Sequence, residues 1–196
     1  MYVESIGSLA FQYCSNIKTV TVEGNRFVDL TIGANAFYGC SLSGALELSE
    51  TVAIGEYAFA NNKNLKNLTL SEKTKSVASY AFYGCDLLKK VNINADKIKL
   101  GLSVFENCRD LREISINSAV IPSGSFAGCV KLEKVTIGSD VAVIGENAFK
   151  NTALKSFTVA EGNATFKAQE GKPYLLSEDG KTLTVDELFE EGYEAI

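Results

Sequence analysis

The five cysteines are the residues of this chain best suited to chemistry, and their spacing is regular. Each follows a phenylalanine by three positions, and they are Cys14, Cys40, Cys85, Cys108 and Cys129. Confinement to one phase of a repeat indicates small buried side chains stacked as a ladder. Because stacked side chains point in parallel, free thiols are favoured, although a repeat spacing of about 4.8 Å also permits disulfide bridges. A zinc site is not expected, since the chain has no histidine and no two cysteines have the short spacing of a zinc knuckle.

The sequence lacks the other groups that enzymes commonly use. Without histidine there is no Ser-His-Asp or Cys-His pair, and neither a P-loop nor a dinucleotide fingerprint is present. The carboxylates of Glu190 and Glu191 lie in an acidic segment that fits a solvated helix face better than a catalytic pair. Asp179 and Gly180 lack the alternating acidic ligands of a calcium loop and fit a plain turn. We therefore predict that the chain is not an enzyme and needs no cofactor.

A repeat centred on phenylalanine must position the cysteines. Seven times an apolar residue precedes a phenylalanine by five positions: Ile6/Phe11, Ile32/Phe37, Ile54/Phe59, Val77/Phe82, Leu100/Phe105, Ile121/Phe126 and Ile144/Phe149. Successive phenylalanines are 26, 22, 23, 23, 21 and 23 residues apart. A period of this length predicts a solenoid of about seven coils, in which each repeat buries its apolar face against its neighbours.

Each repeat ends in an alternating apolar pattern that predicts a strand. The pairs are Val20/Val22, Leu46/Leu48, Leu68/Leu70, Val91/Ile93, Ile114/Ile116, Val135/Ile137 and Phe157/Val159. Alternation sends these side chains inward, so the stacked strands form a short-stranded parallel sheet on one side. On the other side, we expect short helical or 3-10 turns that end at a Gly or Asn two residues after the phenylalanine, since these residues accept the left-handed conformation. The predicted fold class is α/β.

The repeat pattern stops near residue 160, which divides the chain into three segments. We predict repeats over 1–160, a C-terminal β-hairpin cap over 161–184 and an acidic tail or short helix over 185–196. Residues 173–184 fit two strands around a turn at Asp179 and Gly180, placed to cover the open end of the sheet. A capping-box pattern at 184–187 favours a helix that ends at Gly192.

Charge is concentrated at the C-terminal end. The net charge of the 196 residues is −5, and the segment 184–196 holds five acidic residues and no basic one. The remainder is formally neutral, which argues against nucleic-acid binding, because that function relies on a basic excess. No apolar stretch approaches the roughly 20 residues of a membrane span, so this fragment is not expected to insert into a membrane. The chain starts inside a repeat and lacks a signal-peptide pattern, so we expect a piece of a longer protein whose signal and anchor lie outside it.

Two outward-facing columns are candidates for binding. The basic rim is formed by the residue that follows the repeat leucine in five coils: Lys18, Lys66, Lys89, Arg112 and Lys155. Along one edge of the sheet these residues form either a stripe for an anionic partner or, with the acidic residues nearby, an ordinary solvated charge pattern. The polar column is formed by the outward residue inside each strand, with Thr69, Asn92 and Ser115 at its centre. This column is either a binding face or a set of β-favouring residues in contact with solvent.

Tyrosines gather on the phenylalanine side of the repeat, at Tyr13, Tyr38, Tyr57, Tyr80 and Tyr83. Partly exposed tyrosine is a good contact residue, but it also serves to cover the convex surface of a coil.

Segments such as 54–59 (Ile-Gly-Glu-Tyr-Ala-Phe) and 148–159 resemble the BspA-like leucine-rich repeats of secreted and surface proteins of bacteria and some parasitic protists. The resemblance covers roughly residues 3–160, and the following segment, to residue 183, is similar to the hairpin unit that often follows such repeats. The resemblance implies a leucine-rich-repeat solenoid and, for some members, adhesion or binding to host or matrix molecules. It implies no catalytic motif.

The predicted function is a non-enzymatic binding or adhesion module of a secreted or cell-surface protein. Its expected partners are a host or matrix protein or a surface glycan, engaged through the solenoid surface, and its expected location is extracellular or on the cell surface. The alternative is a structural spacer that projects other domains from the cell surface.

Overall fold

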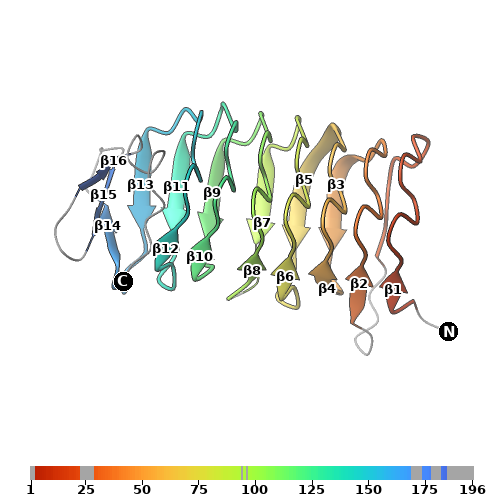
Figure 1. Cartoon of the computed structure of the whole chain (residues 1–196), viewed down its shortest axis with the longest axis horizontal. Helices are drawn as coiled ribbons and strands as arrows, with labels where there is room; N and C mark the ends of the chain where they lie inside the picture. The colour runs from red at the N-terminus through yellow and green to blue at the C-terminus, as the bar shows by residue number, and fades with distance from the viewer. Residues whose placement is uncertain are drawn as a thin grey trace.

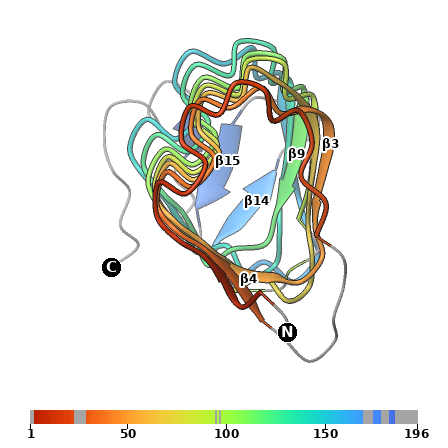
Figure 2. The same ribbon diagram turned by 90° about the vertical axis from the view of Figure 1, so that its right-hand side faces the viewer.

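The repeats wind into a stack of coils, and each coil has three sides (Figure 2). The computed structural model describes residues 3–22, 29–93, 95, 97–168, 174–177 and 182–184. Two sides carry short parallel strands, and the third consists of turns around the repeat phenylalanines. The coils follow one another in a single row from the N-terminus to the C-terminus (Figure 1). The prediction of a parallel-stranded solenoid of about seven turns is confirmed.

The long-strand face contains the strands that the alternating pattern predicts. They are β3 (Ser43–Leu48), β5 (Asn64–Leu70), β7 (Lys90–Ile93), β9 (Glu113–Ile116), β11 (Lys134–Ile137) and β13 (Ser156–Val159). Their apolar residues stack in register, so that Leu68 pairs with both Leu46 and Val91. These side chains point into the core and the residues between them face outward. In the first coil, Val20 and Val22 pack against the core as predicted, but the predicted strand is wrong, because neither residue belongs to a strand.

A second parallel face, which the sequence pattern did not predict, carries the apolar residue that precedes each phenylalanine by five positions. Its strands are β1 (Ser5–Ile6), β2 (Leu30–Ile32), β4 (Thr51–Ile54), β6 (Ser76–Val77), β8 (Lys99–Leu100), β10 (Val120–Ile121) and β12 (Val143–Ile144). We call it the short-strand face. Glycine follows most of these strands because neighbouring coils approach closely there. A Cβ atom at Gly55 would lie 2.6 Å from the backbone nitrogen of Ala34.

The third side, the turn face, contains no helix among the described residues, so the predicted helical or 3-10 turns are wrong, and the predicted α/β class becomes a parallel-strand β-solenoid. The residues two before and two after each of the seven phenylalanines have φ between 51° and 73°. A left-handed residue at both places interrupts any right-handed helix. The sequence indicated the later of these positions but not the earlier one.

The turn face is held by hydrogen bonds between coils. Around Phe82, the N–H groups of Tyr80, Phe82 and Gly84 donate to carbonyls of the next coil at 2.9, 3.0 and 2.9 Å. The same alternation recurs in the neighbouring coils. It satisfies backbone donors without a helix or a sheet, which explains how a chain of turns is stable inside a solenoid.

The core is a ladder of seven phenylalanine rings. Successive rings from Phe11 to Phe149 stack with centroid separations of 5.1 to 5.7 Å and interplanar angles of 3° to 13°. The last ring meets the edge of Phe157 at 5.5 Å and 75°. Six of the seven rings are buried. Phe11, in the first coil, is partly exposed.

The cysteines form the predicted second ladder, and all five thiols are free. Cys85 Sγ donates to the carbonyl of Phe59 in the preceding coil at 3.4 Å, and Cys108 Sγ donates to Phe82 at 3.3 Å. Burial raises the pKa of Cys85 to about 12. Cys14 departs from the prediction of a wholly buried ladder, because it is exposed in the first coil.

Asn62 occupies the cysteine position of its coil and is fully buried. Its Nδ2 donates to the carbonyls of Phe37 and Phe59, both at 2.9 Å, and its Oδ1 accepts from the N–H of Leu42 at 3.1 Å. A polar side chain is tolerated here because its hydrogen-bonding groups have partners.

Both strand faces are interrupted at the same junction. On the long-strand face, β3, β5 and β7 form one sheet and β9, β11 and β13 another, and the short-strand face divides between β8 and β10. The junction is visible in Figure 1 as a wider step in the row of coils. The turn face continues across it, because the N–H of Phe105 donates to the carbonyl of Ser125 at 2.9 Å.

Two sequence features account for the interruption on the short-strand face, between β8 and β10. Pro122 follows β10 where most coils have glycine, and proline has no N–H to donate. The corner of this coil is also short, since Ile121 follows Ile116 by five positions, whereas Leu100 follows Ile93 by seven. Strands β8 and β10 therefore do not pair with each other.

At the C-terminal end, β14 (Phe166–Ala168), β15 (Tyr174–Ser177) and β16 (Thr182–Thr184) form an antiparallel sheet. Strands β14 and β15 contact β13, so this sheet lies against the last coil, as the hairpin prediction required. The predicted turn at Asp179 and Gly180 lies outside the described residues, as do the helix that would end at Gly192 and the acidic tail over 185–196. The segment boundaries at 160 and 184 remain a prediction.

Candidate functional site

The structure brings together the central residues of the basic rim. Lys66 and Lys89 are neighbours across the coils, because the N–H of Lys89 donates to the carbonyl of Lys66 at 2.8 Å. Arg112 lies across the interrupted junction, where it and Lys89 line one depression of about 290 Å³. The remaining lining residues of this depression are Lys90, Glu113, Glu133 and Lys134.

The rim is not uniformly basic. Lys155 is neutralised by Glu133, with Nζ and Oε1 2.9 Å apart, and Glu133 itself occupies the rim position of its coil. The hydrogen bond from Lys155 holds the pKa of Glu133 below its usual range. Lys18 is separated from Lys66 by a coil that presents Ser43, whose N–H bonds to the Lys18 carbonyl at 2.9 Å.

The cations at the centre of the rim have acidic neighbours, since Glu113 and Glu133 line the same depression and Arg112 contributes to lowering the pKa of Glu133. All three of Lys66, Lys89 and Arg112 are exposed, and within the described residues none of them forms an ion pair shorter than 4.0 Å. Asp110 is bonded to Lys131 instead, which lowers the pKa of Asp110, with smaller contributions from Lys89 and Arg112. This centre is therefore the part of the rim whose cations are not neutralised by a direct ion pair within the described residues.

The polar column is divided by the interrupted junction. Thr69 pairs with Asn92 on β5 and β7, whereas Ser115 pairs with Thr136 on β9 and β11. Asn92 and Ser115 are exposed and Thr69 is half-buried. The column lies beside the rim centre, because Lys66 and Thr69 share strand β5.

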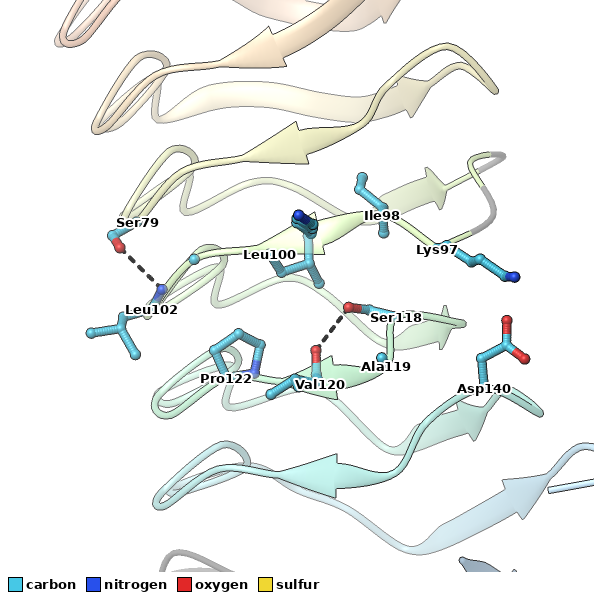
Figure 3. A pocket seen from close by; sticks show the side chains of 12 residues that line it. Ser79, Lys97, Ile98, Leu100, Leu102, Ser118, Ala119, Val120, Pro122 and Asp140 are labelled. Atoms are coloured by element: carbon cyan, nitrogen blue, oxygen red, sulfur yellow. Dashed lines mark hydrogen bonds between the residues drawn. The ribbon is translucent and has the colours of Figure 1, made fainter. Parts of the chain in front are cut away.

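On the short-strand face, the same junction opens an apolar groove of about 930 Å³, which the sequence analysis missed. We call it the junction groove. Leu100, Leu102, Val120 and Pro122 line it, and Lys97 and Asp140 lie at one end of it (Figure 3). Lys99 also lines the groove. The sequence signals were the proline in a glycine position and the shortest of the six repeat steps, 21 residues.

The tyrosines form a continuous aromatic cluster on the turn face. Tyr57 and Tyr80 stack at 4.8 Å and 4°, and Tyr38 and Tyr83 meet them edge-on at 6.3 and 6.1 Å. Tyr13 meets Tyr38 at 5.3 Å and is 65% exposed, whereas the other four are half-buried. Because four of the five rings are half-buried and contact one another, most of the cluster serves to cover the surface of the coils.

The described part of the chain shows neither a metal-binding cluster nor a membrane-spanning helix. No group of three or more His, Cys, Asp or Glu residues there is arranged to hold a metal ion. No helix in that part is long and apolar enough to cross a membrane.

The repeat geometry corresponds to a known family. The family model for the BspA type leucine-rich repeat region matches the chain in six copies, over residues 1–52 and 30–155. The chain belongs to the BspA-type leucine-rich repeat family. Solenoids of this leucine-rich repeat type are typically non-catalytic. No curated protein sequence matches the chain.

Solved structures of bacterial leucine-rich repeat proteins share the fold of this BspA-type chain. A leucine-rich cell surface protein from Faecalibacterium prausnitzii is 20% identical with a TM-score of 0.58, and the match covers 91% of this chain and 53% of that protein. The leucine-rich repeat protein of T. pallidum is 17% identical with a TM-score of 0.54, covering 83% and 76%. The pneumococcal vaccine antigen PcpA is 25% identical with a TM-score of 0.51, covering 90% of this chain and 40% of the antigen. This chain thus spans about half the length of the Faecalibacterium protein.

Proposed function

We propose that this chain is a binding or adhesion module of a cell-surface protein, and that it engages an anionic surface glycan or an acidic region of a host or matrix protein. The observation that carries the proposal is the centre of the basic rim. Lys66, Lys89 and Arg112 are exposed, lie on successive coils and have no ion-pair partner within 4.0 Å among the described residues.

The position of these cations favours recognition over a purely structural role. Lys89 and Arg112 border a depression that two further basic residues and two glutamates also line, so its lining has an excess of positive charge that favours a carboxylate or sulfate. Thr69 and Asn92 lie on the adjoining strands and supply neutral hydrogen-bonding groups. The similar Faecalibacterium protein is a cell surface protein, which supports the same location for this chain.

The second candidate is a structural spacer that projects other domains from the cell surface. The elongated row of coils and the hydrogen bonds that continue along the turn face favour it. A spacer requires a stiff rod but no cations in a shared depression, so the rim centre distinguishes the two functions.

The test is direct binding of the isolated chain to an array of matrix proteins and of neutral, sialylated and sulfated glycans. The module predicts binding to anionic members, and the variant with Lys66→Glu, Lys89→Glu and Arg112→Glu should lose it. Absence of binding to every member, with the chain folded, would favour the spacer.

A further inference from the structure

The first coil leaves open a surface that the following coils bury against one another. Figure 2 views this end of the molecule, and Figure 1 shows the first coil as the outermost of the row. Phe11 stacks on one ring only and is 39% exposed, whereas the rings from Phe59 to Phe149 are fully buried. Ala10 is exposed and Ile6 is half-buried, although the equivalent residues of the second coil are buried. We call this surface the end face.

Gly7, on the end face, has the residue type that close packing requires but no neighbour that requires it. It corresponds to a glycine in four other coils, where an added Cβ atom would lie 2.3 to 2.6 Å from a backbone nitrogen of the preceding coil: Gly33, Gly55, Gly101 and Gly145. A Cβ atom at Gly7 would meet nothing within 4 Å. Glycine costs conformational entropy on folding, so its presence at this position fits a coil that packs ahead of Gly7.

The backbone of the first coil lacks the partners that a preceding coil supplies. In the second coil, three turn-face carbonyls accept hydrogen bonds of 2.8 to 2.9 Å from N–H groups of the first coil; they belong to Ala34, Ala36 and Tyr38. The equivalent carbonyls of the first coil accept no backbone hydrogen bond within the described residues; they belong to Ser8, Ala10 and Gln12. On the short-strand face, the N–H of Gly33 donates to the Ile6 carbonyl at 2.8 Å, whereas that of Gly7 has no described backbone acceptor.

Cys14 has lost a partner in the same way. Each of the other four cysteines donates its thiol to a phenylalanine carbonyl of the preceding coil, with Sγ and the oxygen 3.0 to 3.4 Å apart. Cys14 is exposed and has no such acceptor among the described residues. The end face therefore carries the side chains of a coil interface without the coil that completes it.

These groups define the partner that fits the end face. It must present N–H groups along its turn side and carbonyls opposite Gly7 and Cys14, which is what the coils of this chain present to the coil that follows. A second copy of the chain does not offer this arrangement at either end. Its N-terminal end carries the same unpaired carbonyls, and at its C-terminal end β14 and β15 lie against β13.

We propose that the end face packs against a further coil of the same repeat, joined to the N-terminal side of β1. That coil stacks a phenylalanine ring on Phe11, places the carbonyl of that residue within reach of Cys14 Sγ, and donates its turn-face N–H groups to Ser8, Ala10 and Gln12. The end face lies apart from the rim centre, so this interface goes beyond the function proposed above.

The experiment extends the chain by a copy of residues 53–75, joined directly to Ser5 in place of residues 1–4. In the chain itself this coil pairs with the next one on both strand faces, through β4 with β6 and β5 with β7. The copy contains no cysteine and places its phenylalanine 23 residues before Phe11, a step that already occurs in the chain.

A thiol reagent should label Cys14 at least about tenfold more slowly in the extended chain than in the original chain, because labelling then requires the added coil to open. The thermal unfolding midpoint should also rise, since one more interface between coils is formed. The matched control is the same extension with Phe59→Ser and Leu68→Ser in the copy. It cannot bury its apolar face, and it should leave Cys14 as reactive as in the original chain.

Three results would overturn the proposal. One is equally fast labelling of Cys14 with and without the added coil, and another is equal protection by the control extension. The third is an original chain that light scattering shows to be a dimer with Cys14 protected, because a second copy is then the partner. If the single added coil gains no strand structure by circular dichroism, an extension by two coils, residues 31–75 with Cys40→Ala, applies the same test.

Discussion

Truncation of Phe105 is the sharpest test of the stacked core. Its ring is fully buried between Phe82 at 5.6 Å and Phe126 at 5.7 Å, each at an interplanar angle of 11°. A buried Phe→Ala change costs about 3–5 kcal/mol through lost burial and the cavity that remains. Loss of two stacking contacts, at about 0.5–1.5 kcal/mol each, favours the upper part of this range.

Phe11 provides the matched control within the same ladder. It is 39% exposed and stacks on a single ring, Phe37, at 5.1 Å. Because less area is buried and only one contact is lost, Phe11→Ala should cost about 1–2 kcal/mol.

The assay is urea unfolding of wild type and both variants, followed by far-ultraviolet circular dichroism, since the chain has no tryptophan. The free energies of unfolding are compared at similar m-values. A loss below about 1 kcal/mol for Phe105→Ala would refute the assigned core, because a buried Phe cannot be removed at so low a cost. A larger loss at Phe11 than at Phe105 would do so as well.

Three further predictions follow from the coil contacts. A thiol reagent should label Cys14 in the folded chain and Cys40, Cys85, Cys108 and Cys129 only after denaturation; rapid labelling of four or five thiols in the native state would contradict the buried ladder. Asn62→Ala should lower the free energy of unfolding by about 1–3 kcal/mol, because the buried N–H of Leu42 loses its acceptor and the carbonyls of Phe37 and Phe59 each lose one hydrogen bond. Asn62→Cys should lower the free energy of unfolding by less than Asn62→Ala does, since cysteine occupies this position in five coils. Equal losses for the two variants in urea unfolding would argue that Asn and Cys do not fill the same structural role. Pro122→Gly should introduce an amide that exchanges as slowly as those of Gly101 and Gly145; fast hydrogen exchange would show that the short corner, rather than the proline, separates the strands.

The repeat was readable from the sequence because it depends on residues that recur in one phase. The Phe ladder, the Cys ladder and the long strands each require a particular side chain at a fixed interval, as at Phe82, Cys85 and Val91. The turn face was predicted as helical turns, and that prediction failed because backbone conformation, rather than a side-chain pattern, defines this face. Ser103 and Tyr80 have φ of 51° and 60°, although neither residue type favours the left-handed region.

The candidate sites were only partly predictable for a related reason. The positions of Lys66, Lys89 and Arg112 follow from the period, and the structure places them together at the rim centre. The ion pair of Lys155 with Glu133 joins two neighbouring coils. The sequence predicted only that nearby acidic residues neutralise part of the rim, and not which residues pair. The junction groove arises where the repeat fails, at Pro122 and a shortened corner, and a consensus read across all coils conceals such an exception.

The most direct test of the central claim is the salt dependence of binding at the rim centre. Association of the wild type with the anionic partner found on the array is measured at low and high salt, beside the Lys66→Glu, Lys89→Glu, Arg112→Glu variant. A control that reverses Lys75, Lys150 and Lys167, which are exposed and off the rim, has the same net charge. The account predicts fast, salt-sensitive association for the wild type, retained in the control and lost in the rim variant, because steering depends on charges at the contact. Unchanged affinity of the rim variant at low salt would contradict it.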